Sequence, residues 1–310
     1  KVHPSMTTTV PSIRSFLVVP ITPTTLDSPL LFLLLSVLLK QTNSNGTDQS
    51  YLPTLHLSLP ELIGDRTDFL LWNAQHDTST STSTSTSTSH PDDPTGSTTR
   101  TTSDTVETVD YAIDDIHVDN PGEAAGVIIR AAEAAAALLV PGGRFECIVP
   151  CNTFHAPSIF NACVASSGGV TPIHMVRETV QHIRGMFPNV TTVGVMCTTG
   201  TRSLRLYHDL LEKDGYQVCE VSEQEQNELH RTIYDPHKGI KALGKTTWST
   251  TRFKNYAQTC IGHGAEVIIL GCTEIPIVLT TCAVPLVDPL ICGARALIRK
   301  TYPTKLKMKE

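Results

Sequence analysis

The sequence has little charge, few aromatic side chains and no basic excess. Only 17% of its 310 residues are charged and 5% are aromatic. Lysine and arginine together number 24, against 30 aspartates and glutamates, which gives a formal net charge of −6. A surface that binds nucleic acid needs clustered positive charge, so we do not expect nucleic acid as a partner.

A long hydrophobic run is also missing. The most apolar stretch, residues 30–39, is about half the ~20 residues that a membrane-spanning helix needs. We therefore expect a buried helix there and no association with a membrane. The nine cysteines are odd in number and irregularly spaced, which favours reduced thiols and an intracellular, by default cytoplasmic, protein. The chain begins at Lys1 rather than Met, so organelle targeting stays open.

One internal segment has no apolar side chain that could anchor it to a core. Residues 78–89 are a strict alternation of serine and threonine with polar flanks. We expect a disordered insertion over about 76–105, because such a composition cannot offset the entropy of ordering the chain.

Outside the insertion, short apolar runs alternate with helical stretches. The runs lie at 15–21, 52–59, 145–150, 191–196, 217–221 and 266–270. Helices are expected at 124–139, 202–213 and 248–260, each closed by a glycine or proline signal. This rhythm predicts the α/β class, with parallel sheets covered by helices on both faces.

Two cysteines follow two of these runs. Cys151 comes directly after 145–150, and Cys272 comes just after 266–270. Ligands of open parallel sheets bind beyond the carboxyl ends of the strands, and a nearby helix N-terminus lowers the pKa of a thiol. Both cysteines are therefore expected to face a small molecule.

Two thiols on opposite sides of one substrate suit inversion at carbon. One thiolate removes the Cα proton while the other thiol delivers a proton to the opposite face. Because an amino-acid Cα proton is very weakly acidic, donors must stabilise the carbanion, and Asn152, Thr153 and Thr273 are candidates.

Simpler roles are expected for the neighbouring groups. A free cysteine is usually a small hydrophobe, which we expect for the remaining seven, Cys147, Cys163, Cys197, Cys219, Cys260, Cys282 and Cys292. Cys147, Cys151 and His155 have a spacing that invites zinc, but four residues along a strand separate side chains by about 13 Å, so no metal is expected. His155 could orient a hydrogen bond near Cys151 or simply pack in the core.

Several motifs resemble one known family, the cofactor-independent aspartate/glutamate racemase superfamily and its aspartate racemase branch. Val-Pro-Cys-Asn-Thr-Phe-His at 149–155 and Ile-Leu-Gly-Cys-Thr-Glu-Ile-Pro at 269–276 resemble its paired cysteine motifs. Further segments that resemble the family are 64–67, 197–201, 233–239 and 285–289.

The resemblance implies an α/β protein of two similar domains with the active site in the cleft between them. We expect an extension at 1–13, a first domain at 14–168 completed by 286–310, and a second domain at 169–285. The resemblance also implies a homodimer, a small amino-acid substrate, and neither metal nor pyridoxal phosphate nor any other cofactor.

Residue roles follow from the resemblance motif by motif. It implies that Cys151 and Cys272 are the two acid/base residues, each serving one enantiomer. Arg66 and Lys238 would receive the carboxylates, since a dicarboxylate needs two cations and arginine offers a bidentate fork. The remaining substrate-binding candidates are Asn152, Thr153, Thr201, Thr273 and Glu274, the last of which could also tune Cys272.

We therefore expect an isomerase that racemises aspartate by a two-base mechanism. Glutamate or a broader range of amino acids is the first alternative, and the related isomerases and decarboxylases come next. A non-catalytic dicarboxylate-binding homologue is a further alternative, because residues 16–25 contain no glycine where the family's first loop is glycine-rich.

Overall fold

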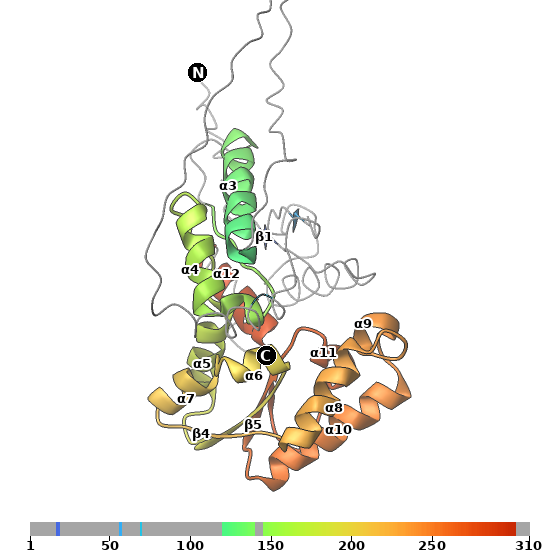
Figure 1. Ribbon diagram of the computed structural model, residues 1–310. Helices are drawn as coiled ribbons and strands as arrows, with labels where there is room; N and C mark the ends of the chain where they lie inside the picture. Colours follow the sequence, from blue (N-terminus) through green and yellow to red (C-terminus); the bar gives the residue numbers. More distant parts are fainter. Residues whose placement is uncertain (1–16, 19–55, 58–68, 70–119, 140–144, 302–310) are drawn as a thin grey trace, which may run out of the picture.

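The computed structural model describes residues 17–18, 56–57, 69, 120–139 and 145–301 (Figure 1). Arg66, the apolar run at 30–39 and the Ser–Thr insertion at 76–105 lie outside the described residues, as does the extension at 1–13. The bounds of the two domains therefore stay a prediction. Within the described part of the chain, no helix is both long and apolar enough to cross a membrane.

A four-stranded parallel sheet organises the second half of the chain. Its strands are β3 (Thr192–Cys197), β4 (Gln217–Cys219), β5 (Val267–Gly271) and β6 (Leu286–Val287), in the order β4-β3-β5-β6. A separate parallel pair joins β1 (Leu17–Val18) to β2 (His56–Leu57). The α/β class and the strands expected at 191–196, 217–221 and 266–270 are thus confirmed.

Burial on both faces explains why β5 is a continuous apolar run. Its side chains alternate between two clusters: Val267 and Ile269 lie in one, and Ile268 and Leu270 lie in the other. The first cluster includes side chains of α5 (Met175–Met186), α7 (His208–Lys213) and α12 (Pro289–Thr301). The second includes side chains of α8 (Glu223–Tyr234), α9 (Ile240–Leu243), α10 (Thr247–Gly262) and α11 (Ile275–Val278), and Figure 1 shows helices on both sides of the sheet.

Two helices that precede the four-stranded sheet in the chain pack closely because glycines line their contact. These are α3 (Pro121–Leu139) and α4 (Pro157–Ser166), which follows the short 3-10 helix η5 (Thr153–His155). A Cβ at Gly122 would lie 2.0 Å from the Ile159 carbonyl oxygen, and one at Gly126 would lie 2.6 Å from that of Cys163. The helix expected at 124–139 is confirmed as α3, and the one expected at 248–260 is confirmed as α10.

Two expectations need correction. The helix expected at 202–213 is divided into α6 (Thr199–Ser203) and α7, because Arg205 adopts a left-handed φ of 52° that interrupts the helix between them. In the run at 145–150, only Ile148 pairs within the described residues, through one parallel bridge to Ile173, so the run is not a described strand.

Candidate active site

Cys272 lies just beyond the carboxyl end of the central strand β5. Gly271 ends that strand opposite Cys197, the last residue of β3, so the segments that follow both strands emerge at the same edge of the sheet. Thr201 follows β3 on α6 and is buried, with its hydroxyl 3.2 Å from that of Thr198. The sheet therefore brings two of the predicted site residues, Thr201 and Cys272, to one edge.

The Cys272 thiol is buried against a charged pair. It is 7% exposed, and its Sγ donates to Glu274 Oε2 at 2.9 Å. The Thr273 hydroxyl donates to the same oxygen at 3.1 Å. The Lys241 ammonium lies 2.8 Å from the other oxygen, Oε1, and Glu274 as a whole is only 4% exposed. Thr273 and Glu274, both predicted from the sequence, thus lie together with Cys272.

The protonation of these three groups follows from their surroundings. Burial raises the pKa of the Cys272 thiol well above its usual value, and the Glu274 carboxylate raises it further. Burial would also raise the pKa of Glu274, but the Lys241 ammonium and the hydrogen bonds from Cys272 and Thr273 lower it overall. Burial opposes the charge on Lys241, yet the Glu274 carboxylate raises the pKa of that amine. The favoured arrangement is a thiol, a carboxylate and an ammonium.

Cys151 is more exposed than Cys272 and lies beside a hydroxyl. Its side chain is half-buried, and its Sγ lies 3.2 Å from the Thr153 hydroxyl. The next residue, Asn152, is buried, and its Oδ1 accepts a hydrogen bond from the Tyr207 hydroxyl. Among the described residues, the Asn152 Nδ2 has no hydrogen-bond partner, so the residue that follows Cys151 keeps a buried N–H donor unpaired.

Tyr207 connects the segments of the two cysteines. This fully buried residue lies between α6 and α7, and its hydroxyl binds Asn152, which follows Cys151. Its ring lies against Gly271, which precedes Cys272: a Cβ at Gly271 would be 3.2 Å from Tyr207 Cε2. One buried side chain therefore contacts the residue next to each cysteine, the Asn152 side chain on one side and Gly271 on the other.

Lys241 also relates the two thiols. After Glu274, both Cys272 and Cys151 contribute to raising the pKa of its amine, against the opposing effect of burial. Both sulfur atoms therefore lie within electrostatic range of one ammonium, whose side chain is only 11% exposed. Neither Lys241 nor Tyr207 was expected from the sequence, although a lone lysine in the apolar segment Ile-Lys-Ala-Leu at 240–243 was an available signal.

Two predicted residues stand apart from this arrangement. Lys238 is 60% exposed on its side chain and lies 4.0 Å from Asp235, with its ammonium 5.1 Å from the centre of the Trp248 ring. Arg66 lies outside the described residues. Of the two alternatives for His155, its contacts favour the packed core residue: it is buried, and its ring lies 4.7 Å from His174 and 5.5 Å from Phe160.

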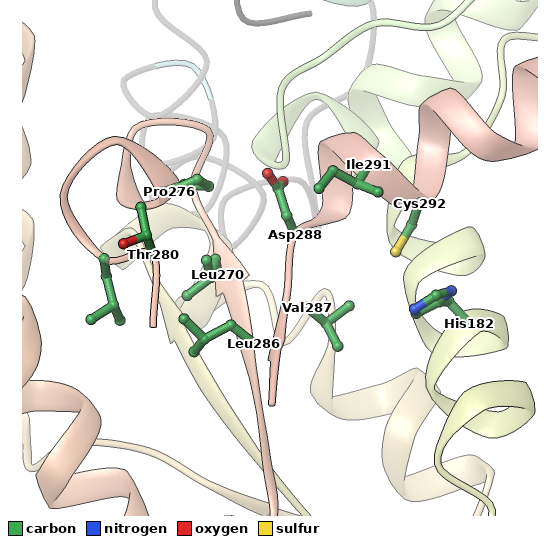
Figure 2. Close-up of a pocket in the computed structure, with 10 residues that line it drawn as sticks. His182, Leu270, Pro276, Thr280, Leu286, Val287, Asp288, Ile291 and Cys292 are labelled. Atoms are coloured by element: carbon green, nitrogen blue, oxygen red, sulfur yellow. The ribbon is translucent and has the colours of Figure 1, made fainter. Parts of the chain in front are cut away.

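A pocket is lined by residues that flank the Cys272 segment in sequence (Figure 2). It has a volume of about 230 Å³, and Leu270 and Pro276 line it on either side of the 271–275 stretch in sequence. Figure 2 shows Leu286 and Leu270 on one side of β6 and His182 and Cys292 on the other. No predicted site residue lines this pocket, so we do not identify it with the space between the thiols.

Comparison with known proteins gives one family match. A family model described as Asp/Glu/Hydantoin racemase matches residues 78–300. A curated protein of Pectobacterium carotovorum, described as an uncharacterised protein in the pnlA 3′ region, is 31% identical over 107 residues, which are 34% of this chain and 67% of that protein.

Solved structures share the fold. An aspartate racemase from Picrophilus torridus matches with a TM-score of 0.57 and 15% identity, over 95% of this chain and 96% of that one. An aspartate racemase homologue from Pyrococcus horikoshii matches with a TM-score of 0.55 and 15% identity, over 93% of this chain and 99% of that one. At this level of identity the likeness extends to the fold and not to the substrate.

Proposed function

The chain belongs to the Asp/Glu/Hydantoin racemase family, and on that basis we propose that it is an amino-acid racemase that inverts aspartate with two thiols, Cys151 and Cys272. The single observation that carries the proposal is that the Tyr207 side chain contacts the neighbours of both cysteines, Asn152 after Cys151 and Gly271 before Cys272. The rise that both thiols contribute to the pKa of Lys241 agrees with this proximity.

The proposed chemistry is a balanced pair of proton transfers. The thiolate of one cysteine takes the Cα proton, so that the C–H bond breaks and an S–H bond forms. The thiol of the other cysteine then gives its proton to the opposite face of the carbanion, so that a new C–H bond forms and a thiolate remains. The configuration inverts, and no oxidant or reductant is consumed.

Substrate binding would use the polar groups around the thiols. We propose that the Asn152 Nδ2 and the hydroxyls of Thr153, Thr201 and Thr273 bind the α-carboxylate or the amino group. The Nδ2 is suited to this because it is a buried donor without a partner in the described residues. Hydrogen bonds to the carboxylate would stabilise the negative charge that develops on it as the proton leaves.

A cation near the thiols would favour a second carboxylate. Lys241 provides a buried ammonium at this position, and we propose it as the partner of the side-chain carboxylate, in place of the exposed Lys238. Arg66 stays the second predicted cation. Two cations for two carboxylates favour a dicarboxylic amino acid over a neutral one.

A chiral assay with a panel of amino acids tests the proposal. The purified protein is incubated separately with L- and D-aspartate, L- and D-glutamate and a neutral amino acid, and the enantiomers are separated by chiral chromatography. We expect both aspartate enantiomers to reach equal amounts and the neutral amino acid to stay unchanged. A Cys151→Ser/Cys272→Ser double variant, purified in parallel, controls for a contaminating racemase.

The other outcomes assign the alternatives. Faster inversion of glutamate than of aspartate would make the protein a glutamate racemase, and comparable rates would make it a broad-specificity one. Binding of aspartate in calorimetry without any inversion would favour the non-catalytic dicarboxylate-binding homologue. Sedimentation of the same preparation tests the proposed homodimer, for which a monomer is the contrary result.

A further inference from the structure

We propose that Glu274 and Lys241 are a positioning pair: the Lys241 ammonium keeps Glu274 ionised, and the Glu274 carboxylate holds Cys272 as the protonated thiol between turnovers. This inference rests on the proposed function and adds to it the protonation state of Cys272 before substrate binds.

The first argument is the hydrogen bond at Cys272. A carboxylate can only accept hydrogen bonds, so the 2.9 Å contact of Cys272 Sγ with Glu274 Oε2 requires the proton to be on sulfur. A thiolate at the same place would put two negative charges side by side in a buried environment. Cys272 and Glu274 are both more than nine-tenths buried, so solvent would do little to screen that repulsion.

The second argument is the part played by Lys241. A buried carboxylate without a partner would tend to take up a proton, and a carboxylic acid could then donate its hydrogen to a Cys272 thiolate. The Lys241 ammonium at 2.8 Å keeps Glu274 ionised and therefore an acceptor. The directions of the pKa changes agree, since that of Glu274 is lowered and that of Cys272 is raised.

The third argument is the contrast with Cys151. Its neighbour at 3.2 Å is the Thr153 hydroxyl and not a carboxylate, and its side chain is only half-buried. The combination of a buried thiol with a buried, paired carboxylate is therefore a feature of the Cys272 side.

A cycle that begins in this state must be reset. When Cys151 has taken the Cα proton and Cys272 has given its own, Cys151 is a thiol and Cys272 is a thiolate beside Glu274. Another turnover in the same direction requires Cys151 to lose the proton that it took and Cys272 to take one up. The enantiomer that presents its Cα–H to Cys151 thus meets an enzyme whose Cys272 proton is in place, and the other enantiomer meets one in which Cys272 must first lose that proton.

Titration of the Cys272 thiol tests the pair without relying on activity. The ultraviolet absorbance of thiolate is followed against pH in the full-length protein and in the same protein with Cys272→Ser, and the difference gives the Cys272 titration. In Glu274→Gln we expect the midpoint to fall by about one pH unit or more, because the repelling carboxylate is gone while the cation stays. In Lys241→Met we expect it to rise, because Glu274 is ionised at the alkaline pH where the thiol titrates.

A merely structural role of the pair would not shift the Cys272 midpoint in opposite directions in Glu274→Gln and Lys241→Met. Lys241→Arg keeps the cation and should titrate like the wild type. Glu228→Gln, which removes a half-exposed carboxylate paired with Arg252, is the matched control and should leave the Cys272 midpoint unchanged. If Lys241→Met does not fold, as judged by its circular dichroism spectrum, Glu274→Gln and Lys241→Arg still test the pair. An unchanged midpoint in Glu274→Gln, or a shift in the same direction in both charge-removing variants, overturns the proposal.

The pH profile of kcat/KM for aspartate gives a second readout. Its alkaline limb should report loss of the Cys272 proton, so it should move to lower pH in Glu274→Gln and stay in place in Glu228→Gln. Racemisation by the wild type with no shift in the variants would sink this inference and leave the proposed function standing. If the titration midpoints shift as predicted but the protein racemises no amino acid, the proposed function fails and the pairing of Glu274 with Cys272 stands.

Discussion

The segments around Cys151 and Cys272 have similar sequences but different surroundings. Each cysteine follows an apolar run and is followed by a threonine within two residues, yet Cys151 is half-buried beside a hydroxyl and Cys272 is buried beside a carboxylate and its lysine. A similar local sequence therefore places the two thiols, while the residue two positions after each cysteine, Thr153 or Glu274, makes their surroundings unequal. Lys241, from α9, then pairs with Glu274 and keeps it ionised.

Replacing either thiol would test whether the two are equally necessary, and we expect this to be the largest effect. Cys151→Ser and Cys272→Ser should each lower aspartate inversion by about 1000-fold, because a hydroxyl is a far poorer base than a thiolate at neutral pH. Chiral chromatography measures the rates. Cys282→Ser, which alters a half-buried cysteine that donates to the Val284 carbonyl, is the control and should keep its activity. Wild-type activity in either thiol variant would remove that cysteine from the mechanism.

Crowding the β5 terminus would disturb the packing of the backbone that leads to Cys272. In Gly271→Ala the new Cβ would lie 2.7 Å from Cys197 Cβ and 3.1 Å from the Met196 carbonyl oxygen, so the strands must shift. We expect the free energy of unfolding to fall by about 1–3 kcal/mol, together with a loss of activity. Urea unfolding measures the first quantity and the chiral assay the second.

Gly185→Ala is the matched control for that substitution. Gly185 lies in α5 with no heavy atom within 4 Å of the added Cβ, so alanine should stabilise the helix by about 0.5–1 kcal/mol. Equal midpoints of urea unfolding for Gly271→Ala and Gly185→Ala would contradict the close packing of Gly271 against β3.

Acid should lower the free energy of unfolding through His155 and His174, which lie in the part of the fold around Cys151. Burial, with the Arg177 charge, lowers the pKa of His174 from 6.5 to about 4, and burial together with His174 lowers the pKa of His155. The unfolded chain therefore binds more protons than the native one between these values, so stability is full above pH 6.5 and falls as the pH drops toward about 4. The expected slope approaches about 1.4 kcal/mol per pH unit for each histidine.

His174→Asn isolates this effect. His174 caps α5 by accepting from the Arg177 N–H, and asparagine can keep that cap without titrating. Urea unfolding of the variant should therefore depend less on pH than that of the wild type between pH 6.5 and 4. Parallel curves for the two proteins would show that His174 does not titrate as its surroundings indicate.

The smallest expected effect concerns Tyr207, whose side chain contacts the residues next to both cysteines. Tyr207→Phe removes the hydroxyl that binds Asn152 and keeps the ring against Gly271. We expect a loss of about 1 kcal/mol in the free energy of unfolding, with a larger relative loss of activity than of stability because Asn152 follows Cys151. Urea unfolding measures the loss of stability, and the chiral assay on the same preparation measures the loss of activity. Unchanged activity would show that the bridge does not position Asn152.

Local pattern was enough to predict the central strands and the position of Cys272. Residues 267–270 of the run at 266–270 are all buried, and such a strand has no polar side to obscure its assignment. The break at Arg205 was not predictable in this way, because apolar periodicity continues through it and only the backbone conformation departs.

The composition of the site was only partly predictable for a related physical reason. Thr273 and Glu274 are neighbours of Cys272 in the chain, so a motif could identify them. Lys241 and Tyr207 reach the site from other elements, and their importance depends on burial and on contacts across the fold. Lys238, the cation predicted from the motif, has a largely exposed side chain and lies three residues before the buried Lys241.

The position of deuterium early in the reaction tests most directly whether two thiols act on one substrate. The wild-type protein is given one aspartate enantiomer in heavy water, and both enantiomers are analysed for deuterium at Cα by mass spectrometry before a tenth or so of the substrate has reacted. Since the proton is removed on one face and supplied on the other, we predict that the product carries deuterium and the remaining substrate keeps its protium. A product that retains protium, or a substrate that exchanges without inverting, would contradict the two-thiol account.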